Sequence, residues 1–248
     1  DSKFGFGVAS GDAGAALERI GASSAMNLVG VHAHIGSQVF DGESYRRAVA
    51  VLAEFVVPFD LPEFSIGGGL GVPYVTGEDA PSITEWADIV TEACRGAGIT
   101  SHVTAEPGRS IVADSAVTLY TVGTIKEIPG IRTFVAVDGG MSDNPRPSLY
   151  GSGYEAFLPR SADAERPMRV RIVGKHCESG DVIIAEADVP ADLEVGDVLA
   201  TPVTGAYGHS MGSNYNMIRR PPVVFVRNGT AREVVRRETY EDLVRRDV

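Results

Sequence analysis

The order of strand-like and helix-like segments constrains the fold of this chain more than any other feature of its sequence. In residues 4–105, β-rich runs alternate with helical patterns, and the runs read "FGFGVA", "NLVGVHAHI", "EFSIGGG" and "SHVTAE". Gly21 marks the expected stop of the first helix and Asp41 the expected cap of the second. Ser82 and Glu85 form a capping box for the third. Strands and helices alternating at this spacing predict parallel βα units.

After about residue 113 the pattern changes to strands alone. The β-rich runs read "SAVTLYTVGTIKEI", "RTFVAVDGG", "MRVRIVG", "GDVIIAEADV" and "GDVLATPV". An Asn-Gly pair at 228–229 inside "VVFVRNGTAREVV" is typical of a hairpin turn, and "ETYEDLVRRDV" predicts a short terminal helix. We therefore predict two domains, an α/β domain in residues 1–112 and a β-domain in residues 113–248.

The α/β domain has too few units to close a barrel by itself. An eight-fold β/α barrel takes about 250 residues, and half of one leaves two unpaired sheet edges. The chain also opens on "DSKFGFGVAS", without an initiator methionine. We expect the missing strands to lie upstream in a longer gene product. The alternative is a different kind of α/β sheet.

Charge and composition exclude several classes of partner. The formal net charge is −11 and there is no run of Lys and Arg, which argues against nucleic acid and anionic membrane surfaces. No apolar run is long enough to span a bilayer. The two cysteines, Cys94 and Cys177, do not make a disulfide framework. A reducing cytoplasm is the expected compartment.

Three polar motifs follow three of the predicted parallel strands: "HAHIGS" at 32–37, "GGGLG" at 67–71 and "AEPGR" at 105–109. Each has an ordinary structural explanation, namely a core histidine, a tight turn and a surface ion pair. A metal site at the two histidines is weaker still, because no third ligand lies at a suitable spacing. However, the carboxyl ends of barrel strands are where active sites of barrel enzymes are built.

The side chains in these motifs suit a flat, phosphorylated cofactor. Glycines with Ser37 and Arg109 suit a phosphate group. The ring of His34 can lie against a flat ring, and Glu106 can hold a protonated ring nitrogen.

Six motifs in order resemble those of one enzyme family over essentially the whole chain. They are "HIGSQ", "GGGLG", "EPGR", "DGGMSDNPRPSLY", "CESGD" and "GAYGHSMGSNYN". The chain resembles the diaminopimelate decarboxylase family, which are pyridoxal 5'-phosphate enzymes with an alanine-racemase-type barrel. The resemblance implies an α/β plus all-β protein, with the later half of a (β/α)8 barrel followed by a C-terminal β-sandwich or barrel-like domain. It also implies lysine biosynthesis by decarboxylation of meso-2,6-diaminopimelate, in a homodimer with shared active sites.

The resemblance also assigns roles to individual residues. It places His34 on the pyridine ring, Glu106 at the pyridine nitrogen, and Arg109 near phosphate and substrate. The phosphate would be surrounded by Ser37, Gly67, Gly68 and Gly69. Substrate or cofactor would be contacted by Arg146, Tyr150, Glu178 and Tyr207. Cys177 and Glu178 would reach into the site of the partner subunit.

One part of the family pattern is missing. The Schiff-base lysine of the family lies in a motif that this chain lacks, and Lys3, Lys126 and Lys175 stand in other contexts. The chain therefore resembles the C-terminal part of the enzyme and is not expected to be catalytically competent alone. Alternatives are a decarboxylase of ornithine, lysine or arginine, and a catalytically silent homologue. A racemase of the same barrel class fits less well, because "CESGD" matches the decarboxylases.

Three residues carry the expected chemistry in the second half. In "GKHCESGDV", Cys177 is our candidate for the acid that protonates the carbon left by carbon dioxide, since a thiol is largely protonated at neutral pH. The alternative is a structural cysteine in a polar turn. Arg146 offers a planar fork for the distal carboxylate of diaminopimelate, and Glu178 a charge for its distal ammonium. The alternative for Arg146 is a surface arginine in a proline-rich loop.

Overall fold

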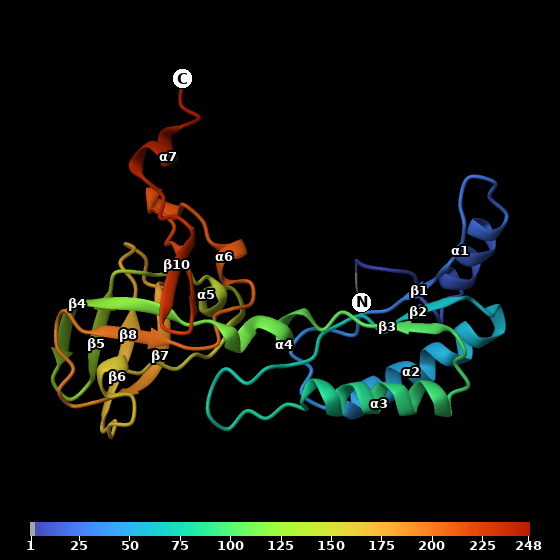
Figure 1. Ribbon diagram of the computed structural model, residues 1–248, viewed down its shortest axis with the longest axis horizontal. Helices are drawn as coiled ribbons and strands as arrows, with labels where there is room; N and C mark the ends of the chain where they lie inside the picture. The colour runs from blue at the N-terminus through green and yellow to red at the C-terminus, as the bar shows by residue number, and fades with distance from the viewer. Residues whose placement is uncertain (1–2) are drawn as a thin grey trace. The chain divides into compact units, whose positions relative to one another are not determined.

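The computed structural model describes residues 3–248, which form two compact units (Figure 1). The first unit comprises the described residues up to Pro73 together with Asp79–Ile111. The second comprises Tyr74–Glu78 and Val112–Val248. The short stretch at 74–78 thus packs as part of the second unit, although the chain on both sides of it belongs to the first.

The first unit contains a small parallel sheet. Its strands are β1 (Gly30–His32), β2 (Glu63–Ser65) and β3 (His102–Thr104), hydrogen-bonded in that order. Its helices are α1 (Asp12–Gly21), α2 (Gly42–Val56), α3 (Ile83–Gly96) and, at its end, α4 (Gly108–Val112), with a 3-10 turn η1 (Val57–Phe59). Both strand pairs are parallel, so the three strands end at one edge of the sheet.

Side-chain caps determine where the two long helices begin. The Asp41 carboxylate accepts the Ser44 backbone N–H at 2.7 Å, directly before α2. Ser82 and Glu85 form the predicted capping box of α3. Each cap satisfies N–H groups that have no partner within the helix, which contributes about 1 kcal/mol. Gly21 is the last residue of α1, as predicted.

Helices α2 and α3 pack together on one face of the sheet (Figure 1). The buried apolar side chains are Tyr45, Val49, Val56, Phe64, Ile66, Leu70, Trp86, Val90 and Cys94. The rings of Tyr45 and Trp86 meet edge to face with centroids 5.5 Å apart, and burial raises the pKa of Tyr45 to about 12. Truncating a buried aromatic side chain costs about 3–5 kcal/mol. Trp86→Ala is therefore expected to weaken this core by about that amount.

The strand predicted for "FGFGVA", at residues 4–9, is wrong. This segment forms bends and turns, and the described part of the first unit has the three parallel strands β1–β3. Gly5 adopts a left-handed φ of 70°, and Phe4 and Phe6 are exposed. The Gly7 carbonyl accepts the Ala13 N–H of α1 at 3.1 Å. The segment therefore uses its backbone groups to lead into α1 instead of pairing in a sheet.

The second unit contains a five-stranded sheet in the order β7-β6-β5-β4-β8. Its strands are β4 (Thr118–Ile128), β5 (Arg132–Val137), β6 (Met168–Val173), β7 (Val182–Val189) and β8 (Val198–Thr201). Neighbours are antiparallel except for β5 and β6, which run parallel. All five were predicted from their β-rich runs. The helices and 3-10 turns of this unit are η2 (Ala113–Ser115), α5 (Arg146–Tyr150), η3 (Pro159–Ser161), α6 (Gly208–Met211), η4 (Tyr215–Met217) and α7 (Tyr240–Val244).

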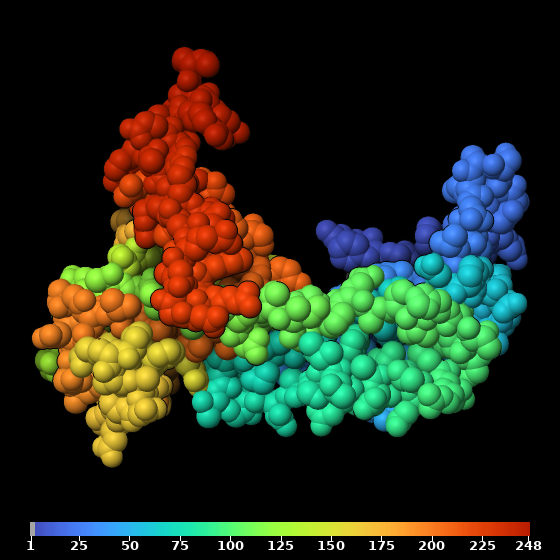
Figure 2. All heavy atoms as spheres, viewed as in Figure 1, coloured from blue at the N-terminus to red at the C-terminus, as the bar shows by residue number. Residues whose placement is uncertain are grey.

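The predicted Asn-Gly hairpin is also present. It consists of β9 (Val223–Arg227) and β10 (Thr230–Val235), and both Asn228 and Gly229 have the positive φ that a tight hairpin turn needs. Most of the hairpin is exposed, including Phe225 and Val226. Figure 2 shows the C-terminal segment, in red, standing out from the rest of the second unit. A two-stranded ribbon of this kind is marginally stable by itself.

Among residues 3–248 no helix is long and apolar enough to cross a bilayer. The 15-residue α2 is amphipathic and contributes its buried face to the core.

Candidate active site

The carboxyl ends of β1, β2 and β3 bring the three predicted motifs of the first unit together. Backbone hydrogen bonding continues past the strands: the Ala33 N–H donates to the Ser65 carbonyl at 2.9 Å, and the Glu106 N–H to the Gly67 carbonyl at 2.8 Å. His34, the glycines and Glu106 therefore lie along one edge of the sheet. This edge is the place where a parallel α/β sheet presents ligand-binding groups.

The three glycines after β2 have no room for side chains. Gly67 and Gly69 have positive φ values of 69° and 97°. A Cβ on each of the three would overlap a carbonyl oxygen of a neighbouring loop, belonging to Ala33, Glu106 and Gly36 in turn. The glycines are therefore needed for the packing of the motifs against one another. The same close packing leaves backbone surface that a phosphate can approach.

His34 is held by the glycine loop. Its Nδ1 accepts the backbone N–H of Gly68 at 3.2 Å. This bond requires a lone pair on Nδ1, so the ring proton of the neutral imidazole lies on Nε2. The residue is exposed, which excludes the core-histidine explanation. A ring held in this way at the edge of the sheet can stack on a flat cofactor.

Glu106 is oriented by two side chains, neither of which was predicted as a site residue. His32 Nε2 lies 3.3 Å from one of its carboxylate oxygens, and Ser65 Oγ donates to it at 3.2 Å. His32 and Ser65 are register partners at the ends of β1 and β2, so their side chains lie on the same face of the sheet. The sequence signal was their position, two residues before His34 and Gly67.

Arg109 is buried at the start of α4 and donates to the Ser37 hydroxyl at 3.0 Å. Its burial shows that Arg109 is not a surface side chain. A buried guanidinium beside a hydroxyl is a suitable binding place for an anion such as phosphate.

In the second unit, Arg146 is a buried cation among neutral groups. Its side chain donates to the Tyr154 hydroxyl at 3.1 Å and to the Ser152 hydroxyl at 3.1 Å, and the rings of Tyr74 and Tyr150 lie 5.2 and 5.7 Å from it. No carboxylate of the described residues lies within 4.0 Å of the guanidinium. The explanation as a surface arginine is therefore wrong. A buried charge of this kind favours an external anion.

The loop with Cys177 and Glu178 lies between β6 and β7 and is fixed by Asp181. The buried Asp181 carboxylate accepts the Met141 N–H at 2.7 Å and the His176 N–H at 2.8 Å. It thereby ties this loop to the one that leads to Arg146. Cys177 and Glu178 themselves are exposed. Asp181 stands in the quoted motif, but its anchoring role was not predicted.

A third segment of the same unit carries Tyr207 and Tyr215. Tyr207 precedes α6 in a left-handed conformation, with φ 64°, and is about half exposed. The Tyr215 hydroxyl donates to Glu178 at 2.7 Å. Tyr215 was not predicted as a site residue.

Comparison with known proteins connects these observations to one enzyme. The family model "Pyridoxal-dependent decarboxylase, pyridoxal binding domain" matches residues 1–113. The diaminopimelate decarboxylase of Actinosynnema pretiosum is 47% identical across 100% of this chain, which covers 58% of that enzyme. The crystal structure of M. jannaschii diaminopimelate decarboxylase in co-complex with L-lysine matches with a TM-score of 0.90 and 34% identity, over 100% of this chain and 58% of that one.

The chain is a homologue of part of a diaminopimelate decarboxylase. A lysine/ornithine decarboxylase from Vibrio vulnificus, complexed with putrescine, is less similar, at 25% identity and a TM-score of 0.68 over 84% of this chain and 57% of that one. The family resemblance seen in the motifs is thus confirmed. The chain spans about three-fifths of the length of the curated relative.

In the described part of the chain, no group of three or more His, Cys, Asp or Glu is arranged to hold a metal ion.

Proposed function

We propose that this chain is part of a pyridoxal 5'-phosphate enzyme that converts meso-2,6-diaminopimelate to L-lysine and carbon dioxide. The observation that carries the proposal is the buried Arg146, which has hydroxyls and aromatic rings around it and no described carboxylate within 4.0 Å. Diaminopimelate ends in an ammonium and a carboxylate on one carbon. Lysine and ornithine end in a bare ammonium, for which a buried arginine is unfavourable.

The finer architecture is part of the same proposal. The first unit would be the later half of a (β/α)8 barrel, and the second a C-terminal β-sandwich or barrel-like domain, with the boundary near residue 112. The Schiff-base lysine would belong to the part of the enzyme outside this chain. The relatives, of which this chain spans about three-fifths, support this division. We further propose a homodimer with shared active sites, and a cytoplasmic location stays a prediction.

The first unit fits pyridoxal 5'-phosphate at the carboxyl edge of its sheet. Ser37, Arg109 and the backbone of Gly67, Gly68 and Gly69 would hold the phosphate. When bound, the pyridoxal ring takes up the electron pair released as the carbon–carbon bond breaks. The His34 ring would lie on its face. Glu106, oriented by His32 and Ser65, would hold a proton on the ring nitrogen because a carboxylate favours the charged form of its partner.

The second unit would bind both charged groups at the distal end of the substrate and return the proton. Arg146 would form a two-bond fork to the distal carboxylate, and its bonds to Tyr154 and Ser152 fix the plane of the guanidinium. Glu178 would accept the distal ammonium, with Tyr150 and Tyr207 as further contacts. Cys177, an exposed free thiol beside Glu178, would protonate the carbon that has lost carbon dioxide. Cys177 and Glu178 would serve the site of the partner subunit.

The test compares substrates with the full-length enzyme. Purified enzyme saturated with pyridoxal 5'-phosphate is assayed for carbon dioxide release from meso-diaminopimelate, L-lysine and L-ornithine. We expect kcat/KM for diaminopimelate to exceed the other two by several orders of magnitude, as for sites built around a polar group of the substrate. Equal turnover of lysine or ornithine would assign the chain to a general basic-amino-acid decarboxylase instead.

A further inference from the structure

Tyr215 contacts one of the proposed substrate-binding groups directly. Its hydroxyl donates to Oε1 of Glu178 at 2.7 Å, a distance typical of a hydrogen bond to a charged carboxylate. This bond raises the pKa of the Tyr215 phenol, so the hydroxyl keeps its proton and stays a donor. The bond occupies one oxygen of Glu178 and leaves the other available for a substrate ammonium.

The ring of Tyr215 is also held in place. It lies against the ring of His176, with centroids 5.5 Å apart. His176 is buried, and its Nε2 lies 2.9 Å from the Ser142 hydroxyl. The Ser142 carbonyl in turn accepts the Ser213 N–H at 2.8 Å. The Tyr215 segment is thereby connected to the loops of Arg146 and Cys177 within the same unit.

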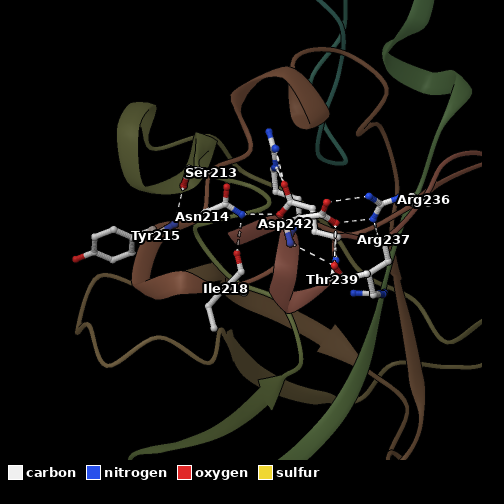
Figure 3. A network of polar contacts seen from close by, with 10 residues as sticks. Ser213, Asn214, Tyr215, Ile218, Arg236, Arg237, Thr239 and Asp242 are labelled. Atoms are coloured by element: carbon white, nitrogen blue, oxygen red, sulfur yellow. Dashed lines mark hydrogen bonds and ion pairs between the residues drawn. The ribbon is translucent and has the colours of Figure 1, made fainter. Parts of the chain in front are cut away.

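The backbone around Tyr215 is strained and anchored from the other side. Asn216 and Met217 have positive φ values of 53° and 56°, which non-glycine residues adopt mainly where the surrounding structure enforces it. The enforcing contact is the Asn214 amide, which donates to the Glu238 carboxylate and to the Ile218 carbonyl. In Figure 3 the Tyr215 ring points away from this network.

Glu238 makes this anchor strong. It accepts the backbone N–H and the guanidinium of Arg220, both at 2.8 Å, and Arg220 lowers the pKa of Glu238 to about 2. The charged, largely buried carboxylate of Glu238 holds the strained turn, and the turn fixes the direction in which the Tyr215 side chain points.

We propose that Tyr215 is a positioning residue for substrate specificity, which holds the Glu178 carboxylate in the orientation that receives the distal ammonium of the substrate. The proposal rests on the proposed function. Glu178 is exposed, and without the hydroxyl we expect its side chain to lose its fixed orientation in the unbound enzyme. Substrate binding then has to order it, and ordering one flexible side chain weakens binding by about 3- to 10-fold.

The first test is Tyr215→Phe in the full-length enzyme with its cofactor. Because the variant removes only a hydroxyl from a side chain that is 43% exposed, the fold should be kept. We expect KM for diaminopimelate to rise about 3- to 10-fold with kcat within about twofold. The Kd of L-lysine, measured by calorimetry without turnover, should rise by the same factor, because the amino-acid end of lysine occupies the same distal pocket.

The matched control is Tyr240→Phe. Tyr240, the first residue of α7, is also exposed, and the centroid of its ring lies 4.4 Å from the Arg219 guanidinium. We expect this variant to leave KM, kcat and the lysine Kd unchanged.

A double-mutant cycle with Glu178→Gln separates positioning from a general structural role. If Tyr215 acts through Glu178, Tyr215→Phe should change KM in the Glu178→Gln background by much less than in wild type. An equal change in both backgrounds, or an unchanged KM and lysine Kd in Tyr215→Phe alone, would overturn the role of Tyr215. A wild-type enzyme that does not decarboxylate diaminopimelate would overturn the proposed function, and the Tyr215 proposal with it.

Discussion

Replacing Arg146 tests the substrate assignment most directly, because the structure allows the size of the effect to be worked out. Hydrogen bonds to charged groups contribute about 1.5–3 kcal/mol each. A two-bond fork to the distal carboxylate therefore contributes about 3–6 kcal/mol, or roughly 10²- to 10⁴-fold in kcat/KM at 1.36 kcal/mol for each factor of ten. Arg146→Ala should lower kcat/KM for diaminopimelate by this factor and leave the low activity on lysine nearly unchanged.

Two further variants separate charge, shape and packing at this position. Arg146→Lys keeps a charge but not the planar fork, so it should restore only part of the preference. Arg146→Met keeps the buried stem without the charge and controls for packing, because Arg146→Ala also leaves a cavity. Both variants remove the donor to the Tyr154 and Ser152 hydroxyls. The assay is steady-state decarboxylation of both substrates, with melting temperature recorded for each variant. A stable Arg146→Met enzyme that still prefers diaminopimelate by the wild-type ratio would refute the reasoning.

Four other outcomes are expected. Glu106→Gln should retain the cofactor, seen by its absorbance, yet slow turnover severely, because a neutral amide holds the ring-nitrogen proton less well; near-normal turnover would remove Glu106 from this role. Cys177→Ala should slow lysine formation by about 10²- to 10⁴-fold with little change in substrate affinity, and an unchanged rate would make Cys177 a structural residue. The pKa of Glu238 is lowered from 4.5 to about 2 in the folded protein, so its stabilisation is complete above about pH 4.5 and is lost as pH falls toward 2; the melting temperature of Glu238→Gln should therefore depend less on pH in this window than that of wild type. Residues 1–248 expressed alone should be insoluble or molten, because the sheet β1–β3 has unpaired edges and the β9–β10 hairpin exposes Phe225 and Val226; a soluble monomer that melts cooperatively would contradict this.

Local signals predicted most of the secondary structure. The caps at Asp41 and at Ser82 with Glu85 act within a few residues, as does the Asn-Gly turn, so the sequence contains all the information they need. The failure at residues 4–9 has the same local origin. Glycine at position 5 takes a left-handed conformation, and the following residues bond to the start of α1, so alternating phenylalanines there did not make a strand.

The contacts that orient the candidate site were not predictable in the same way. His32 reaches Glu106 across 74 positions of sequence, and Tyr215 reaches Glu178 across 37. The sequence spacing of the two residues predicts neither contact. The contact of His32 with Glu106 depends on strand register, and that of Tyr215 with Glu178 depends on a strained turn. Motifs identified the groups suited to chemistry, and only the fold showed which neighbours orient them.

The glycine loop after β2 has a consequence for mutational scanning. Since no Cβ fits at Gly67, Gly68 or Gly69 without overlapping a neighbouring carbonyl, every substitution there should reduce the amount of folded protein even when cofactor is absent. A screen that scores activity alone would attribute this loss to cofactor binding. Ser37→Ala, in contrast, shortens a side chain and adds no atom to that packed backbone. A scan that also measures protein abundance should therefore find that activity and abundance fall together at the glycines, whereas at Ser37 activity falls and abundance does not.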